Sequence, residues 1–227
     1  MLLDLIRGGD IFEIIVGVCV SAFVVFCIIP IHEYAHAFIA YKLGDETARL
    51  KGRLTISPLA HINWIGAILI LLVGFGFAEP VPVNIRNVRM KNKKLAMAII
   101  ALAGPVSNLL MAFLSLVIMA LFTIILPRIG NVEDVVYYAI LMFFQYAAII
   151  NINLAVFNLL PVPPLDGSRI LFAVLPTKYY FKVMKYERYI VLVVMALLIF
   201  GVLTGPLSLI SDMIYDLFYN IIFSLMF

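Results

Sequence analysis

Two histidines and a glutamate stand close together in the stretch "CIIPIHEYAHAF" (27–38), inside otherwise strongly apolar sequence. His32 and His36 are four residues apart, so on a helix both imidazoles project from one face, with Glu33 beside them. The H-E-x-x-H pattern is typical of a helix that binds zinc in a hydrolase. Zinc with an open coordination position lowers the pKa of water, and Glu33 is the natural general base.

These three side chains have an alternative interpretation that involves no metal. Polar residues inside a membrane can join helices or relay protons, and they are not always metal ligands. However, two imidazoles and a carboxylate at membrane depth cost several kcal/mol unless they are paired. Because one dication satisfies all three groups together, the sequence favours a metal site.

A zinc site of this kind needs at least one more protein ligand. The candidates are His61, Glu79, Asp134, Asp166, Asp212 and Asp216. Asp166 is the best placed, because three prolines in "FNLLPVPPLDG" (157–167) force extended backbone where an apolar segment ends. Its alternative role is to cap a helix that starts at Ser168. His61 is the main competing ligand, although its position more often suits a solvated loop histidine.

The composition predicts the environment in which these residues work. The chain is 65% hydrophobic and 13% charged, and several apolar stretches reach the roughly 20 residues that a membrane-spanning helix needs. We therefore expect an all-α polytopic membrane protein with about five to six transmembrane helices. We expect one membrane-embedded domain over 1–227, with a catalytic core over about 11–170 and C-terminal helices over 171–227. The net charge of +3, with basic residues in loops, favours contact with a lipid bilayer over nucleic acid.

The apolar segments and the loop charges together predict the topology. The segments lie near 11–41, 62–78, 95–126, 135–160 and 189–203, with a last one from 207 to the end. Pro30 interrupts the first segment just before the histidines. Basic residues follow the first, second and fourth segments, which places all three loops on the cytoplasmic side. This requires 62–78 to be a re-entrant segment, and the alternative is an ordinary short span.

The stretch "ARLKGRLTISP" (48–58) alternates apolar and polar residues. A period of two predicts a short β-strand or hairpin over 49–57. An unpaired strand edge is normally a liability, but here it can capture an extended substrate, with Leu54 and Ile56 as contact residues. The alternative is a solvated basic loop.

Four stretches occur in the order typical of a known family: "HEYAH" (32–36), "GFGFAEPVPVN" (74–84), "LAGPVSN" (102–108) and "FNLLPVPPLDG" (157–167). With them the chain resembles the site-2 protease family of intramembrane zinc metalloproteases, in particular its small single-domain prokaryotic members. The resemblance implies that one Zn²⁺ is bound by His32, His36 and Asp166. It also implies that Glu33 activates water and that Asn108 holds substrate or polarises the scissile carbonyl.

Physical arguments give only partial support to the roles that the resemblance implies for two asparagines, Asn108 and Asn158. Asn108 follows a run of small residues that permits close helix packing, and its amide can donate to a developing oxyanion. It can equally be a polar contact between helices. The resemblance implies that Asn158 helps to shape the approach of the aspartate loop and binds substrate, but an asparagine at a helix end has several structural uses.

These inferences lead to one expected activity and two alternatives. We expect a zinc metalloendopeptidase that cleaves within or near the transmembrane segment of a membrane-protein substrate. We also expect it to lie in a prokaryotic inner membrane, with its active site towards the cytoplasm. A zinc or proton-coupled transporter is less consistent, because the sequence shows no internal repeat. A non-catalytic scaffold would have no use for Glu33 beside the metal.

Overall fold

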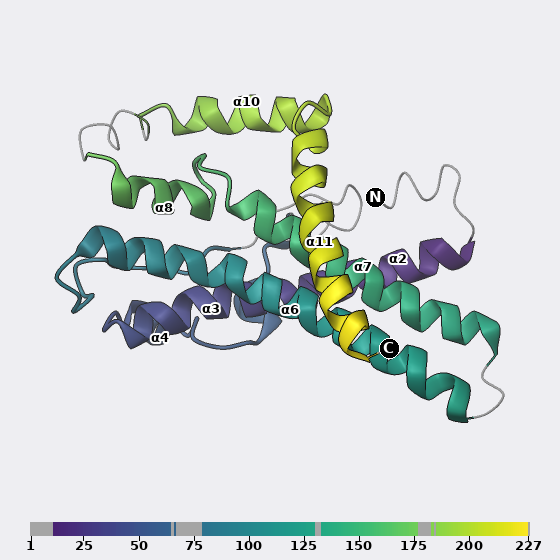
Figure 1. Cartoon of the computed structure of the whole chain (residues 1–227). Helices are drawn as coiled ribbons and strands as arrows, with labels where there is room; N and C mark the ends of the chain where they lie inside the picture. Colours follow the sequence, from purple (N-terminus) through teal and green to yellow (C-terminus); the bar gives the residue numbers. More distant parts are fainter. Residues whose placement is uncertain are drawn as a thin grey trace.

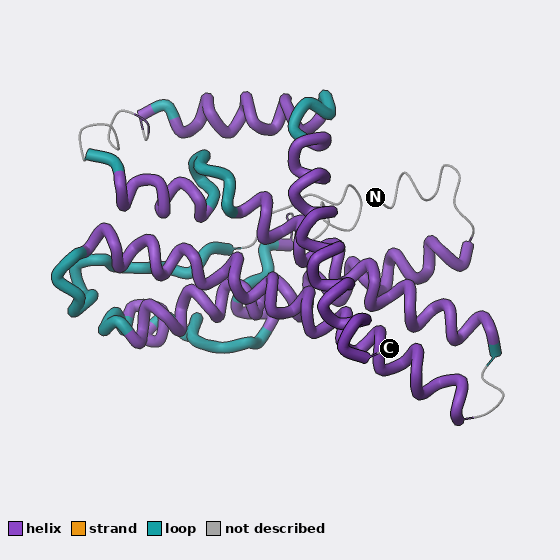
Figure 2. The backbone as a smooth tube through the Cα atoms, viewed as in Figure 1, coloured by secondary structure: helices purple, strands orange, loops and turns teal. Residues whose placement is uncertain are grey.

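The computed structural model of the chain describes residues 11–64, 66, 79–129, 133–176, 183 and 185–226. Over these residues the chain is helical, with loops and no β-strand (Figure 2). Four helical segments in this part are long and apolar enough to cross a membrane: Ile11–Lys42, Lys93–Arg128, Asp134–Asn158 and Thr204–Met226. The predicted all-α fold is therefore confirmed for the described residues, which contain four candidate membrane spans where about five to six were expected.

The order of the elements can be followed in Figure 1. The first span consists of α2 (Ile11–Phe23), the π-helical turn η1 (Val24–Ile28) and α3 (Ile29–Lys42). Two short elements follow, α4 (Thr47–Leu50) and the 3₁₀ turn η2 (Pro58–Ala60). The remaining helices are α6 (Lys93–Ile129), α7 (Asp134–Asn158), α8 (Asp166–Val174), α10 (Glu187–Ile199) and α11 (Thr204–Met226).

Pro30 leaves a π-turn in the first span. Proline has no N–H, so the carbonyl of Phe26, four residues earlier, has no α-helical partner. The chain adapts by bonding the N–H of Ile29 to the carbonyl of Val24, one residue further back than in an α-helix. The helix therefore continues through the proline, and His32 lies at the start of the regular helix that follows.

Helix α6 is the element on which the others assemble. It contacts α3, α7, α8 and α11, and Figure 1 shows it running beside α3 and α7. Small side chains allow helices in a membrane to approach closely, where van der Waals packing holds them together. The buried small residues of α6 include Ala96, Ala101, Ala112 and Ala120.

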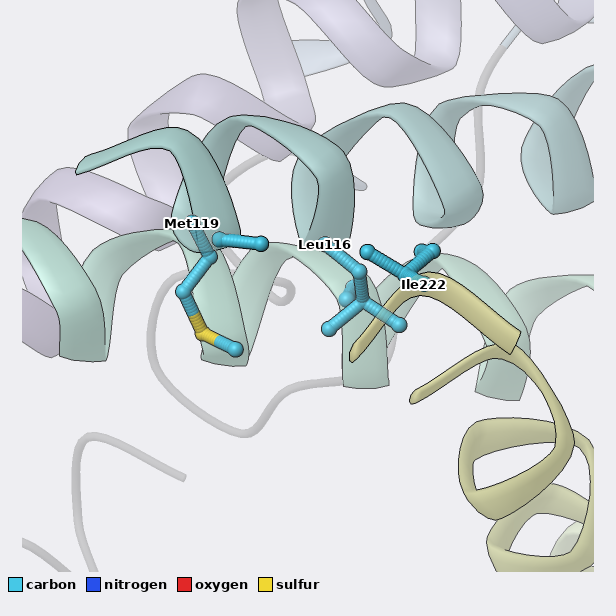
Figure 3. Close-up of a cluster of buried hydrophobic side chains, with 5 residues drawn as sticks. Leu116, Met119 and Ile222 are labelled. Atoms are coloured by element: carbon cyan, nitrogen blue, oxygen red, sulfur yellow. The ribbon is translucent and has the colours of Figure 1, made fainter. Parts of the chain in front are cut away.

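Helix α11 packs on the part of α6 that lies away from the histidines. Figure 3 shows Leu116 of α6 between Met119 of the same helix and Ile222 of α11, in a cluster completed by Ala120 and Ala148. Leu116 is roughly 18 Å along the helix from Gly104, at a rise of about 1.5 Å per residue. The C-terminal helix thus stabilises the half of α6 that is remote from the candidate site.

Two predicted segments in the membrane are not confirmed. Helix α10 has 13 residues, or roughly 20 Å, which is too short to cross a hydrocarbon core of about 30 Å. The predicted re-entrant segment at 62–78 falls almost wholly outside the described residues, because 65 and 67–78 are not among them.

The β-strand predicted over 49–57 is wrong, and the alternative of a loop holds. Helix α4 occupies Thr47–Leu50, and turns and irregular loop follow as far as Ser57. The N–H of Arg53 bonds to the carbonyl of Ala48 at 2.8 Å, and Gly52 has a φ of +68°. Local hydrogen bonds thus close the chain on itself, because the described residues offer no neighbouring strand to complete a ladder.

The apolar residues of this loop do not share one environment. Leu54 is partly buried against Ala37, Ala48 and Val81, whereas the side chain of Ile56 is 64% exposed. The alternation that suggested a strand therefore arises from a loop that packs one apolar side chain inwards and leaves the other exposed.

Candidate metal centre

The structure brings His32, His36 and Asp166 together. The Nε2 atoms of His32 and His36 are 3.1 Å apart. Asp166 Oδ2 lies 3.4 Å from Nε2 of His32 and 3.2 Å from Nε2 of His36. All three residues are buried, and the two helices that carry them, α3 and α8, both pack on α6.

This triangle of atoms fits a tetrahedral zinc ion. Zinc binds nitrogen and oxygen at about 2.0–2.2 Å, which places its ligand atoms roughly 3.3–3.6 Å apart. The observed separations are 3.1–3.4 Å. Two imidazole nitrogens and a carboxylate oxygen this close repel one another unless they share a proton or a cation. Three protein ligands also leave one position open, as in catalytic zinc sites.

Helix α6 orients one of the two imidazoles. His36 Nδ1 donates to the backbone carbonyl of Ile100 at 2.7 Å. In a neutral ring this leaves Nε2 unprotonated and directed at the cluster, as a metal ligand requires. Nδ1 of His32 is buried without a hydrogen-bond partner in the described part of the chain. His32 is therefore held by packing, with its ring centroid 4.8 Å from that of His36 in an edge-on arrangement.

Gly104 of α6 forms the surface on which both rings rest. A Cβ at this position would lie 2.5 Å from Nε2 of His32 and would overlap Nε2 of His36. No side chain larger than hydrogen fits there without displacing the candidate ligands. The sequence placed Gly104 in a run of small residues, but it did not indicate that the glycine touches the metal site.

The chain between α7 and α8 delivers the third ligand. Residues 159–165 carry Pro161, Pro163 and Pro164 and form no helix, as the prolines predicted. Leu165 precedes α8, which has no side-chain cap, so the predicted alternative of Asp166 as an N-cap is wrong. The carboxylate is directed at the histidines instead.

Close packing also fixes the start of α8. A Cβ on Gly167 would overlap the backbone carbonyls of Leu159 and Leu160. The Asp166 carboxylate faces both imidazoles, and it must be ionised to bind a metal.

Glu33 is held by the backbone of a loop far away in the sequence. The N–H of Val81 donates to Oε2 of Glu33 at 3.0 Å. This bond fixes one carboxylate oxygen beside the metal-binding face of α3. Sequence reasoning missed the contact, because no periodic pattern connects a helix with an irregular loop.

Asn108 lies one helical turn beyond Gly104 and is 1% exposed. Neither its Oδ1 nor its Nδ2 has a hydrogen-bond partner among the described residues. A buried amide left unpaired costs about 1–3 kcal/mol, and such groups occur at functional sites. A polar contact between helices would be expected to show a partner, so this observation favours a role towards a ligand.

The other predicted candidates lie outside the cluster. His61 is fully buried rather than solvated, and its Nε2 bonds to the carbonyl of Thr55 at 2.8 Å. Glu79 forms an ion pair with Arg53 at 2.6 Å. Asn158 donates from Nδ2 to the carbonyl of Leu154 in its own helix at 2.9 Å. The remaining acidic candidates, Asp134, Asp212 and Asp216, do not belong to the group of possible metal ligands.

The chain is similar to known zinc proteases. Residues 123–201 match the family model described as peptidase family M50. The chain is 42% identical over 160 residues to YwhC, a candidate zinc metalloprotease of Bacillus subtilis (strain 168), and the match covers 70% of each chain. It is 31% identical over 143 residues to MJ0611, a candidate zinc metalloprotease of Methanocaldococcus jannaschii, covering 62% of each. It is 30% identical over 145 residues to Rip2, a candidate zinc metalloprotease of Mycolicibacterium smegmatis, covering 60% of this chain and 50% of the relative. No solved structure matches the chain.

These similarities agree with the geometry of the site. The relatives share the name of zinc metalloprotease, and the described residues provide a buried group that fits zinc. The four apolar helices make the chain a multi-pass membrane protein. The protein is therefore a membrane metalloprotease with a zinc cofactor, and it belongs to peptidase family M50, the site-2 proteases.

Proposed function

We propose that this protease hydrolyses a peptide bond within or next to the transmembrane segment of another membrane protein, as in regulated intramembrane proteolysis. The observation that carries the proposal is the position of the metal cluster inside a candidate span. His32 and His36 belong to the apolar segment Ile11–Lys42. His36 lies roughly 9 Å along the helix from its end at Lys42. This position within an apolar segment supports cleavage within or next to a transmembrane segment.

The proposed chemistry assigns one role to each buried polar group. Zinc supplies a Lewis acid that polarises the scissile carbonyl and lowers the pKa of water. His32, His36 and Asp166 hold the ion. Glu33 takes a proton from the attacking water and passes it to the leaving amine. Asn108, whose amide is buried and unpaired, donates to the oxyanion that develops on the carbonyl.

An apolar groove between α3 and α6 suits the approach of a transmembrane substrate. Its lining includes Phe38 and Ile39 of α3 and Leu102 and Val106 of α6. These residues flank His36 and Gly104 in sequence, which supports an approach of the substrate to this face of the two helices.

The basic loops support an orientation with the site towards the cytoplasm of a prokaryotic cell. Helix α3 ends and α6 begins on the same side of the molecule, because the N–H of Arg89 bonds to the carbonyl of Leu43 at 2.7 Å. Both neighbouring loops are rich in basic residues: Arg49, Lys51 and Arg53, and Arg86, Arg89, Lys91, Lys93 and Lys94. Lys and Arg concentrate on the cytoplasmic side of bacterial membranes.

Zinc content and proteolysis, measured on the same purified samples, test the proposal. The substrate is a synthetic peptide with a fluorophore and a quencher on either side of an Ala/Leu transmembrane segment of roughly 20 residues, interrupted by Asn-Gly. We expect about one zinc per chain in the wild type and a loss of zinc in His36→Ala and Asp166→Ala. Glu33→Gln should keep its zinc and lose about 10²–10⁴-fold in kcat, because a general base contributes that much.

Each alternative predicts a different outcome. If Asp166→Ala keeps its full zinc, the ligand assignment is wrong. If Glu33→Gln still cleaves the peptide at the wild-type rate, Glu33 is not the base. Zinc uptake into proteoliposomes that depends on the cluster, without cleavage of any transmembrane peptide, would favour a transporter.

A further inference from the structure

A second set of buried polar groups lies where α3 ends, and its centre is Asp45. This carboxylate is fully buried. Its Oδ1 accepts hydrogen bonds from the Thr47 N–H at 3.0 Å, the Thr47 hydroxyl at 2.5 Å and the Asn87 amide at 3.2 Å. Its Oδ2 accepts one from the Asn84 N–H at 2.6 Å. A buried carboxylate is costly unless such donors satisfy it.

The donors come from two separate parts of the chain, which Asp45 therefore joins. Thr47 begins α4, whereas Asn84 and Asn87 belong to the loop that leads to α6. The same two parts meet again where the Arg89 N–H bonds to the carbonyl of Leu43 at 2.7 Å. The loop is thus fastened to the end of α3 at several points, and Asp45 provides the buried one.

The segment just before Asn84 is stiff. Pro80 and Pro82 each fix their own φ, and each restricts the preceding residue to extended backbone. The other end of the segment is also anchored, because the Glu79 N–H bonds to the carbonyl of His61 at 3.0 Å. A short, stiff segment held at both ends keeps its register with respect to α3.

That register decides which group meets Glu33. Because proline has no N–H, Val81 is the one residue of 80–82 that can donate from its backbone. The Val81 N–H donates to Oε2 of Glu33 at 3.0 Å. A shift of the segment along its axis would present a proline nitrogen to the carboxylate instead.

We propose that Asp45 is a positioning residue of the protease: by holding the Asn84 N–H, it keeps the Val81 N–H on the carboxylate of Glu33. The proposal rests on the proposed role of Glu33 as the general base. Asp45 acts at a distance and touches neither substrate nor metal. When the anchor is lost, the carboxylate is no longer oriented, and the rate falls while the zinc ligands keep their places.

Asp45→Asn separates the two halves of the anchor. An amide has one oxygen where the carboxylate has two, so it cannot accept at both positions. Because Oδ1 serves three donors and Oδ2 serves one, the amide oxygen should stay with Thr47 and Asn87. The NH₂ group then faces the Asn84 N–H, donor against donor. Thr47→Val is the matched control, because it removes a donor from Oδ1 and leaves the Asn84 bond intact.

Hydrogen exchange at the Val81 amide measures the anchor directly. Within residues 80–82 this is the only exchanging backbone amide, so its rate can be resolved in a short fragment. We expect Asp45→Asn to speed its exchange by on the order of tenfold or more, because the hydrogen bond opens more often. We expect Thr47→Val to leave the exchange rate within about threefold of the wild type. Unchanged exchange in Asp45→Asn would refute the anchor.

Cleavage of the same transmembrane peptide, with zinc content measured alongside, tests the consequence for catalysis. We expect kcat to fall about 10–100-fold in Asp45→Asn, as for a catalytic group misplaced by about 1 Å, with KM and zinc content unchanged. Faster exchange of Val81 with an unchanged kcat would overturn the positioning role. If the wild type itself cleaves nothing, the proposed function fails, and the exchange experiment still decides whether Asp45 anchors the segment.

Val81→Pro shows whether Asp45 acts through the Val81 N–H. It removes this donor while leaving both anchors in place, at a position where the following proline already requires extended backbone. If Asp45 works through Val81, the double variant should be no slower than Val81→Pro alone; additive losses would contradict that route. If Asp45→Asn does not fold, Asn84→Pro takes its place, because proline removes the N–H that Oδ2 of Asp45 accepts, and unchanged Val81 exchange would again refute the anchor.

Discussion

Gly104→Ala should weaken zinc binding by at least about 100-fold although it adds a single methyl group. The new Cβ would lie 2.5 Å from Nε2 of His32, about 0.9 Å short of the 3.4 Å at which ordinary contact begins. It would overlap Nε2 of His36 as well. Zinc sites tolerate ligand displacements of about 0.2 Å. Either the rings separate by several times this amount or α6 retreats and stretches the bond between His36 and Ile100.

The loss of zinc affinity in Gly104→Ala can be estimated from substitutions that disturb metal ligands only indirectly. Substitutions that only disturb the groups around metal ligands cost about 10–100-fold in affinity. Gly104→Ala displaces two ligands directly, so we expect the zinc Kd to rise by at least about 100-fold. The helix itself should not suffer, because alanine favours a helix by about 1 kcal/mol over glycine.

Competition with a chelator gives the zinc Kd, and circular dichroism of the solubilised protein checks that it is folded. Gly205→Ala in α11 is the matched control, because a Cβ there meets nothing within 4 Å. It makes the same chemical change and should keep the wild-type Kd. A folded Gly104→Ala protein whose zinc Kd lies within threefold of the wild type would show that α6 does not press against the histidines.

Three further predictions concern other parts of the site. Gly167→Ala should lower zinc content without removing a ligand, because its Cβ would overlap the carbonyls of Leu159 and Leu160 and shift the start of α8; normal zinc content would contradict this packing. Burial raises the pKa of Asp45, but hydrogen bonds to its carboxylate outweigh this and hold the pKa below 3.8. The group therefore contributes stability that is complete above about pH 4 and is lost as the pH falls through the lowered pKa; thermal unfolding between pH 7 and pH 2 should show a smaller pH dependence in Asp45→Asn than in the wild type. Asn108→Leu should raise the free energy of unfolding by about 1–3 kcal/mol, because it removes an unpaired buried amide, while lowering kcat; a variant that is less stable than the wild type would show that the amide has a partner.

The metal ligands on α3 could be predicted because helix geometry is regular. Four residues separate His32 from His36, and any α-helix places such a pair on one face. Helix geometry alone could not predict Asp166 as a ligand, because 129 residues separate it from His36 and had to fold before the two side chains met. The prolines before Asp166 indicated a break in the helix, but the direction of its carboxylate depends on how α8 packs on α6. The sequence pattern therefore predicted that Asp166 follows a helix break, but only tertiary packing shows that Asp166, and not His61, is the third candidate ligand.

The strand predicted over 49–57 did not form, because local backbone hydrogen bonds outweighed the alternation of apolar and polar side chains. Leu50, Gly52, Leu54 and Ile56 follow the period of a strand, but a strand also needs a partner for its backbone. The Asp45 carboxylate accepts a hydrogen bond from the N–H of Thr47 at 3.0 Å, in an Asx-type turn just before α4, and the chain enters a helical turn there in place of an extended strand. Asp45, which bonds to Thr47 at the start of this helical turn, is also the residue that we propose as the anchor of the loop beside Glu33.

The site is thus assembled from two kinds of structure whose damage should have different effects. Its metal ligands depend on α3, α6 and α8, so substitutions that disturb helix packing, such as Gly104→Ala, should remove zinc and activity together. Its candidate base depends on an irregular loop fastened by Asp45, so substitutions there should remove activity and leave zinc. Because none of the three zinc ligands hydrogen-bonds to this loop in the described residues, a variant's zinc content and kcat together indicate which of the two supports has been damaged.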